Sequence, residues 1–217
     1  MIILALDTAA ADCAACLLDT ETDRVLARVS ETIGKGHAER LMAVLDACLS
    51  EADMKLTQVH RIAVNIGPGS FTGIRVGVST ARALAVACGC QCVGVSSLGA
   101  LAAQHSPRLK GCVALATIDA RRGEAYIQAF DAEGEPLSEP SAVRYDELER
   151  LAMERQAVAV GSGAVAAGIA APRMEDNVAI ETIARLGAVA KAETSVAPLY
   201  LRAPDAKPQA GFTLARA

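Results

Sequence analysis

The pattern of apolar and polar positions divides the first half of the chain into short strands followed by helices. Apolar runs of strand length at residues 2–7, 13–18 and 25–29, joined by short polar turns, predict an antiparallel meander. Strands are also predicted at 62–66 and 92–95, with a helix at 78–88 between them and another beginning at Ser96 or Ser97. Between 37 and 52 the apolar residues follow the spacing of an amphipathic helix, namely Leu41, Val44, Leu45, Cys48, Leu49 and Ala52.

The same order of elements begins again after Ser106-Pro107, which is interpreted as a linker. A strand at 113–118 ends in Asp119, as the first strand ends in Asp7. The predicted elements that follow are a strand at 125–130, a turn at 131–136, helices at 145–155 and 182–192, a strand at 158–160, and a tail at 203–217. The pattern predicts an α/β protein with two β-β-β-α-β-α lobes, 1–106 and 107–217, of which the second is reduced. By analogy, this order resembles the fold of actin, sugar kinases and the Hsp70 ATPase domain.

Composition and charge narrow the classes of function. The 217 residues are 52% hydrophobic but only 3% aromatic, and the net charge is −4, so no global basic field would attract nucleic acid. An odd number of cysteines, seven, indicates reduced thiols. Cys13 and Cys16 have a CxxC spacing, but on a strand they would point to opposite faces, which argues against a metal or redox site. No run of residues is long and apolar enough to cross a membrane, and the first residues do not resemble a signal peptide, so a cytoplasmic protein is expected.

A glycine-rich stretch, residues 67–77, separates a predicted strand from a predicted helix. Its four glycines imply a backbone that bends sharply and lies close to another group, and a turn that leads into a helix suits an anion. The simpler interpretation is that Gly67 and Gly69 only allow a tight turn. No lysine occurs between Lys55 and Lys110, which excludes a P-loop, and Thr72 stands at the third glycine of the dinucleotide pattern.

This stretch resembles the Gly-Pro-Gly-Ser-Phe-Thr-Gly segment of the TsaB (YeaZ) family. Three further segments are similar to that family: the Asp-Thr turn at residues 4–8, the Asp-Ala-Arg-Arg segment at 118–126, and the Pro-Leu-Tyr-Leu-Arg segment at 198–202. The resemblance therefore spans nearly the whole chain.

The resemblance implies a non-catalytic partner subunit. Such a subunit supports a catalytic TsaD subunit, together with the small ATPase TsaE, in transferring a threonylcarbamoyl group to N6 of the adenosine beside the anticodon of tRNA. It would meet tRNA only indirectly. TsaD binds its metal through two histidines four residues apart, whereas Leu41 follows His37 at that spacing, so no metal site and no catalytic residue are expected here.

Two other classes of function compete with this interpretation. A free-standing ATP-dependent kinase or ATPase of the same fold would need a complete acid–glycine first turn. An RNA-binding protein is disfavoured by the acidic charge and by the absence of aromatic-basic motifs.

The fold analogy also gives candidates for contact with a nucleotide or another anion. Asp7 and Asp119 lie where acids surround the phosphates in actin-like ATPases. However, Thr8-Ala9-Ala10 lacks the usual glycine, which favours structural roles for both acids. No cofactor is expected on the chain alone, and ATP or ADP would bind only at a joint interface in the complex. The candidate contacts are Asp7, Thr8, Gly67, Gly69, Ser70, Arg75 and Asp119.

The helix after the glycine stretch is apolar nearly all round, and such a helix must be covered on both sides. Its outer stripe predicts a subunit interface through which the protein forms a homodimer when alone, and in which TsaD replaces one copy. Alternatively, the first helix or the second lobe covers the stripe within one chain. The interface candidates are Met42, Val76, Thr80, Ala83, Leu84 and Ala87.

Overall fold

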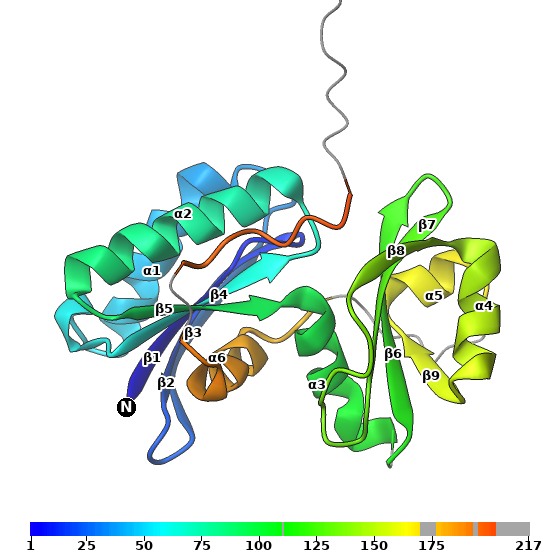
Figure 1. Ribbon diagram of the computed structural model, residues 1–217. Helices are drawn as coiled ribbons and strands as arrows, with labels where there is room; N and C mark the ends of the chain where they lie inside the picture. The colour runs from blue at the N-terminus through cyan, green and yellow to red at the C-terminus, as the bar shows by residue number, and fades with distance from the viewer. Residues whose placement is uncertain (110, 170–176, 193–194, 203–217) are drawn as a thin grey trace, which may run out of the picture.

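The structure, a computed structural model, describes residues 1–109, 111–169, 177–192 and 195–202. Its strands form two separate sheets, and one helix, α3 (Ser97–Leu109), leads from the first sheet to the second (Figure 1). No helix within these residues has the length and apolar character needed to cross a bilayer.

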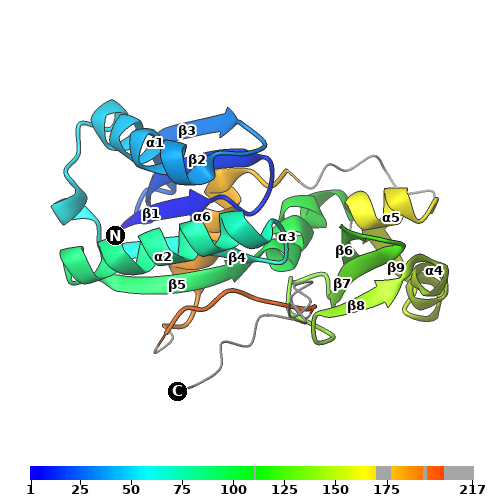
Figure 2. The same ribbon diagram turned by 90° about the horizontal axis from the view of Figure 1, so that it is seen from above.

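The first sheet has five strands in the order β3-β2-β1-β4-β5. The first three strands are antiparallel, and β4 and β5 run parallel to β1, which confirms the predicted meander and the two later strands. Helices α1 and α2 cover one face of this sheet, and α6 covers the other (Figure 2). The bounds are Ile2–Asp7 for β1, Asp12–Asp19 for β2, Arg24–Thr32 for β3, Arg61–Gly67 for β4, Gln91–Ser96 for β5, His37–Glu51 for α1, Phe71–Cys88 for α2 and Ile180–Val189 for α6.

Alternating side chains of β2 enter two different cores. Cys13 and Leu17 pack in the core beneath α1 and α2, whereas Cys16 and Leu18 pack in the core beneath α6. The two cysteines of the CxxC spacing therefore lie on opposite faces of the sheet, as predicted from strand geometry.

The second sheet repeats the arrangement of the first in a shorter form. Its order is β8-β7-β6-β9, with β6, β7 and β8 antiparallel and β9 parallel to β6, so it corresponds to β3-β2-β1-β4. Helix α3 covers one face, and α4 and α5 cover the other. The bounds are Val113–Arg121 for β6, Glu124–Phe130 for β7, Ser141–Arg144 for β8, Ala157–Val160 for β9, Tyr145–Glu154 for α4 and Ser162–Ala166 for α5. The repeat confirms the predicted actin-like α/β fold with a reduced second lobe.

Several local predictions were wrong. Ser106-Pro107 is not a linker but part of the last turn of α3, which buried His105 and Leu109 hold in place. The helix predicted at 182–192 is present, but its bounds are Ile180–Val189, and it packs on the first sheet, where Gly187 lies directly against Ala63. The sequence pattern did not predict β8, α5 or the short 3-10 helix η1 (Leu56–Gln58). The division of the chain into lobes at residues 106 and 107 remains a prediction. Helix α3 runs through this position, and α6, which follows the second sheet in the sequence, packs on the first sheet.

Residues 195–202 form an extended segment, here called the strap, that runs from the first sheet to the second (Figures 1 and 2). The amide of Leu199 donates a hydrogen bond to the carbonyl of Ile66 at 2.8 Å, and Val196 is buried in the core of the first sheet. At its other end Arg202 donates to the carbonyl of Ala120 at 3.0 Å and pairs with Glu124. The predicted tail, 203–217, lies outside the described residues.

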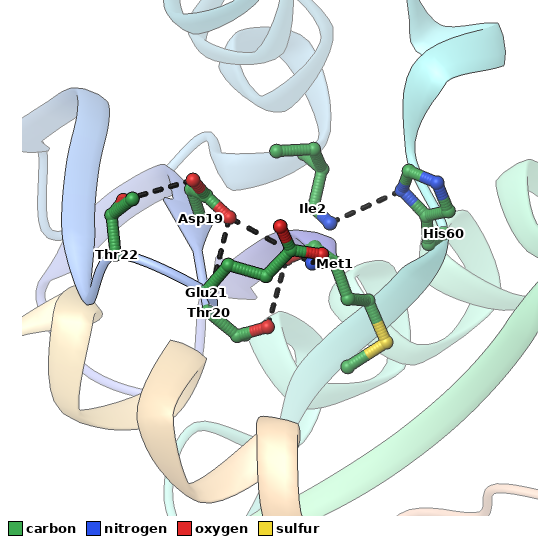
Figure 3. A network of polar contacts seen from close by, with 7 residues as sticks. All are labelled: Met1, Ile2, Asp19, Thr20, Glu21, Thr22 and His60. Carbon is green, nitrogen blue, oxygen red and sulfur yellow. Dashed lines mark hydrogen bonds and ion pairs between the residues drawn. The ribbon is translucent and has the colours of Figure 1, made fainter.

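A polar network fixes the start of β1 between its two neighbouring strands (Figure 3). The amide of Ile2 donates to Nδ1 of His60 at 3.1 Å, and the His60 amide donates to the Ile2 carbonyl at 2.9 Å. On the other side, the hydroxyl of Thr20 donates to the Met1 carbonyl at 3.1 Å. These bonds hold the register that places Asp7, at the opposite end of β1, beside the glycine stretch.

Candidate functional site

The glycine stretch packs the start of α2 directly onto the turn that follows β1. Helix α2 begins at Phe71, not near residue 78 as predicted, because Gly73 and Gly77 lie inside the helix. A Cβ atom at Gly69 would collide with the carbonyl oxygen of Ala9, and one at Gly73 with the carbonyl oxygen of Thr8. The glycines therefore allow the backbone of α2 to meet the backbone of the first turn.

Hydrogen bonds close this contact. The Thr8 hydroxyl donates to the Gly73 carbonyl at 2.7 Å, and the Ser70 amide donates to the Ala9 carbonyl at 2.7 Å. The Ser70 hydroxyl accepts from the Gly73 amide at 3.2 Å and so caps the helix. The groups of the first turn that resemble a phosphate site are thus bound to the protein itself.

Asp7 is the centre of a buried polar network. One of its carboxylate oxygens accepts a hydrogen bond from the Ala9 amide at 2.8 Å, and the other accepts from Asn65 Nδ2 at 3.1 Å. The Oδ1 of Asn65 in turn accepts from the Gly67 amide and the Ser97 hydroxyl. Burial raises the pKa of Asp7 above its ordinary value, although both hydrogen bonds act in the opposite direction. Asp7 joins β1, β4 and α3, which is a structural role.

Asp119 has the corresponding place in the second lobe. Its carboxylate accepts from the Arg121 amide at 2.7 Å and from the Tyr145 hydroxyl at 2.6 Å, and it lies 3.3 Å from the Arg121 guanidinium. Its own amide donates to the Ser162 hydroxyl at 2.7 Å. Asp119 thus stabilises the turn at the end of β6, much as Asp7 stabilises the first turn.

Two adjoining clefts lie between the lobes. The first, of about 830 Å³ and here called the acid cleft, contains four of the predicted contacts: Asp7, Gly69, Ser70 and Asp119. The second, of about 740 Å³ and here called the arginine cleft, contains Arg75. The residues that line both clefts are Pro68, Gly69, Ala120, Arg121 and Tyr126. Thr8 and Gly67 are buried and line neither cleft. The structure therefore brings most of the predicted residues together but separates Arg75 from the acids.

The arginine cleft was not predicted as a site. Phe71 and Arg75 come from the start of α2, Arg121 and Arg122 from the end of β6 and the turn after it, and Tyr126 from β7. The strap completes the cleft with Tyr200 and Arg202. These residues lie far apart in the sequence, so no local motif revealed them. However, they all belong to three of the segments that resemble the TsaB family. That common origin was the one sequence feature that could have indicated a shared site.

Aromatic rings orient the arginines of this cleft. The guanidinium of Arg75 lies 3.7 Å from the centre of the Phe71 ring, and its Nε donates to the Tyr200 hydroxyl at 2.8 Å. The centres of the Phe71 and Tyr200 rings are 5.2 Å apart. Arg202 lies 6.0 Å from the centre of the Tyr126 ring.

A metal ion would need several His, Cys, Asp or Glu side chains close together in the described part of the chain. No three His, Cys, Asp or Glu side chains there are grouped so that they could hold a metal ion. Burial raises the pKa of the Cys13 thiol to about 11 and that of the Cys16 thiol to about 12, so neither is the thiolate that a reactive or metal-binding cysteine requires at neutral pH.

The outer face of α2 remains open in the single chain. Ala83 and Ala87 are exposed, Met42 of α1 is 51% exposed, and Val76, Thr80 and Leu84 are half-buried. Helix α1 lies beside α2 (Figure 2), and the exposure of these residues shows that it does not cover the stripe. Its use as an interface stays a prediction.

Comparison with known proteins identifies the family. A protein from Escherichia coli named "tRNA threonylcarbamoyladenosine biosynthesis protein TsaB" is 32% identical over 75% of this chain and 72% of its own length. The chain belongs to the TsaB family. An uncharacterised Mycobacterium tuberculosis protein is 32% identical over 97% of this chain and 96% of its own length.

Two further comparisons agree with this membership in the TsaB family. The structure of YeaZ from Pseudomonas aeruginosa matches with a TM-score of 0.76 and 28% identity, covering 92% of this chain and 99% of that one. Residues 26–205 also match the family model described as "TsaD: tRNA N6-adenosine threonylcarbamoyltransferase".

Proposed function

We propose that this chain is the non-catalytic partner subunit of the enzyme that transfers a threonylcarbamoyl group to N6 of the adenosine beside the anticodon of tRNA. Membership in the TsaB family supports the pathway. The observation that carries the non-catalytic role is the closed first turn, in which Asp7 holds the Ala9 amide and Gly73 holds the Thr8 hydroxyl. A turn whose polar groups already bind each other offers little to a phosphate.

The proposed partners are a TsaD-like catalytic subunit and a TsaE-like ATPase. The catalytic subunit would supply the metal and the reacting groups, and this chain would meet tRNA mainly through that subunit. ATP or ADP would bind only at a joint interface, to which this chain would contribute the acid cleft, lined by Asp7, Ser70 and Asp119 among others. The expected location is the cytoplasm, where tRNA is modified.

The outer face of α2 is the proposed contact with the catalytic subunit. Its alanines are small enough to let another helix approach closely, and exposed Met42 extends the apolar surface onto α1. In the absence of the partner, two copies of this chain would form a two-fold dimer through the same face. A catalytic subunit of the same fold would replace one copy.

The alternative of a free-standing kinase or ATPase is not favoured. That activity needs a first turn that can approach a phosphate closely, and here Ala9 and Ala10 carry side chains while α2 covers the backbone.

Nucleoside analysis of tRNA tests the proposal. Cells of the source organism depleted of this chain should lose threonylcarbamoyladenosine, and a plasmid copy of the wild-type chain should restore it. The level of another modified nucleoside in the same tRNA serves as the control. An unchanged level of threonylcarbamoyladenosine after depletion would contradict the proposal.

A further inference from the structure

The arginine cleft concentrates features that are rare elsewhere in this chain. The whole sequence has three phenylalanines, three tyrosines and no tryptophan, and three of these six rings, Phe71, Tyr126 and Tyr200, line this one cleft. Four arginines line it as well, and no aspartate or glutamate is among the described residues of its wall. Arg121 pairs with Asp119 and Arg202 with Glu124, and neither acid lines the cleft. A local surface of guanidinium groups and aromatic rings on a chain of net charge −4 indicates an anionic, planar ligand.

The turn that carries two of the arginines has an unusual backbone. Arg121, Arg122 and Gly123 have φ angles of 63°, 60° and 81°, all in the left-handed region. Two-residue hairpin turns of this kind favour asparagine, aspartate or glycine, because a larger side chain strains the left-handed conformation. Arg121 pairs with Glu124 at the end of β6, so the two-residue turn is Arg122-Gly123, and both arginines have a strained backbone. This strain implies that their side chains serve a purpose other than forming the turn.

Arg75 is fixed on the opposite wall of the cleft. Its guanidinium lies over the Phe71 ring and donates through Nε to Tyr200, and it forms no ion pair with any of the described residues. Phe71 is 42% exposed and Tyr200 is 45% exposed, so each ring retains a surface that a ligand can reach. Proteins bind single-stranded nucleic acid by stacking bases on such rings and on guanidinium planes, while other arginines contact the phosphates.

We propose that the arginine cleft binds one nucleotide unit, with its base stacked near Phe71 and Tyr200 and its phosphate held by arginines of the β6–β7 turn. A cleft of about 740 Å³ has the size of a small-ligand site. A nucleotide of single-stranded RNA and a free nucleotide share this chemistry. The arginine cleft adjoins the acid cleft and shares Arg121 and Tyr126 with it, but Phe71, Arg75 and Tyr200 line the arginine cleft alone. The proposal does not depend on the proposed function, because binding is measured on the isolated chain.

The test uses fluorescence anisotropy of the full chain with a fluorescein-labelled single-stranded oligoribonucleotide. Arg121→Gln and Phe71→Leu should each weaken binding by about 5- to 100-fold, since stacking and phosphate contacts each contribute on this scale. Tyr200→Phe keeps the ring and should lose less than Phe71→Leu. Arg24→Gln removes an exposed arginine outside the cleft and should bind like the wild type. Circular dichroism checks that every variant is folded.

Unlabelled competitors show whether the site takes RNA, a free nucleotide or an acidic peptide. If unlabelled oligonucleotide displaces the probe and AMP does not, the site takes RNA. If AMP displaces it equally well at the same nucleotide concentration, the site takes a free nucleotide, and the proposal stands in both cases. It would be overturned if wild-type chain does not bind the probe, or if Arg121→Gln loses no more affinity than Arg24→Gln. Stronger displacement by an oligoglutamate peptide than by either nucleotide would also overturn it.

Discussion

The α-carbon of Gly73 lies against the carbonyl group of Thr8, so that no side chain fits between α2 and the turn after β1. The Thr8 hydroxyl donates a 2.7 Å hydrogen bond to the Gly73 carbonyl and fixes the contact. This pair explains why a glycine-rich stretch precedes a helix without forming a phosphate loop. Its glycines serve the packing of two backbones, and the fold around Asp7 depends on that packing.

Replacing Gly73 with alanine should therefore destabilise the protein. The added methyl group would force α2 away from Thr8, and overpacking of this kind costs about 2 to 3 kcal/mol. Urea denaturation measures the change in the free energy of unfolding. Ser79→Ala, at an exposed position of the same helix, should stay within about 0.5 kcal/mol of the wild type. If Gly73→Ala is as stable as Ser79→Ala, the contact does not have the importance assigned to it.

Asp7 should give the protein an unusual dependence of stability on pH. Its pKa is raised in the folded protein above the ordinary value of 3.8, so the folded state binds this proton more tightly than the unfolded state does. Its contribution to the free energy of unfolding is then largest below 3.8 and falls as the pH rises through the folded pKa. A salt-bridged aspartate, with a lowered pKa, would show the opposite trend.

The comparison of wild type with Asp7→Asn isolates this effect, because the variant cannot titrate at that position. Urea denaturation at a series of pH values should show the stability of wild type relative to the variant decreasing as the pH rises. A difference that is independent of pH, or that increases with pH, would show that burial does not dominate the pKa of Asp7.

The proposed interface on α2 predicts the effect of one charge. Wild-type chain should be dimeric by light scattering, and Ala83→Glu should be monomeric, because the dimer would bury an unpaired carboxylate. Circular dichroism should show that the variant is folded. Ala166→Glu places the same charge at an exposed alanine of α5 and should remain dimeric. A monomeric wild type, or a folded Ala83→Glu that stays dimeric, would exclude this interface.

The isolated chain should not hydrolyse ATP. The Ala9 amide is already bound to Asp7, and side chains at Ala9 and Ala10 stand where a phosphate would need close backbone approach. Phosphate release with magnesium and ATP should equal that of a sample without protein. Calorimetry that finds magnesium-dependent binding in the micromolar range, about −8 kcal/mol, would contradict this prediction. Binding of a nucleotide in the arginine cleft should not require magnesium, and this difference distinguishes it from binding of ATP at the first turn.

Much of the fold followed from local periodicity. The apolar runs of β1, β2, β4 and β6 and the stripe of α1 are long and regular, and the repeated strand–acid turn revealed the two lobes. The errors occurred where long-range packing overrides local signals. Pro107 normally ends a helix, but the buried residues around it extend α3 through Leu109. Gly73 and Gly77 normally weaken a helix, but the first turn requires them inside α2.

The candidate site was only partly predictable for the same reason. The acids at the ends of β1 and β6 followed from the pattern, because each ends a strand of equivalent position. The contact of Arg75 with Tyr200 joins residues that are 125 positions apart, and only the strap brings them together. A site formed by the turn of one lobe, the helix of the other and a terminal segment leaves no contiguous pattern in the sequence.

Reconstitution of the transfer reaction from purified proteins tests the central proposal most directly. The assay measures threonylcarbamoyladenosine formed in tRNA from threonylcarbamoyl adenylate, with the TsaD-like and TsaE-like proteins of the same organism. This chain alone should form none, the TsaD-like protein alone should form little, and their mixture should be active in the presence of the TsaE-like protein. Two results would contradict the assignment of this chain as a non-catalytic partner subunit. One is that this chain modifies tRNA without the TsaD-like protein, and the other is that the TsaD-like protein is fully active without this chain.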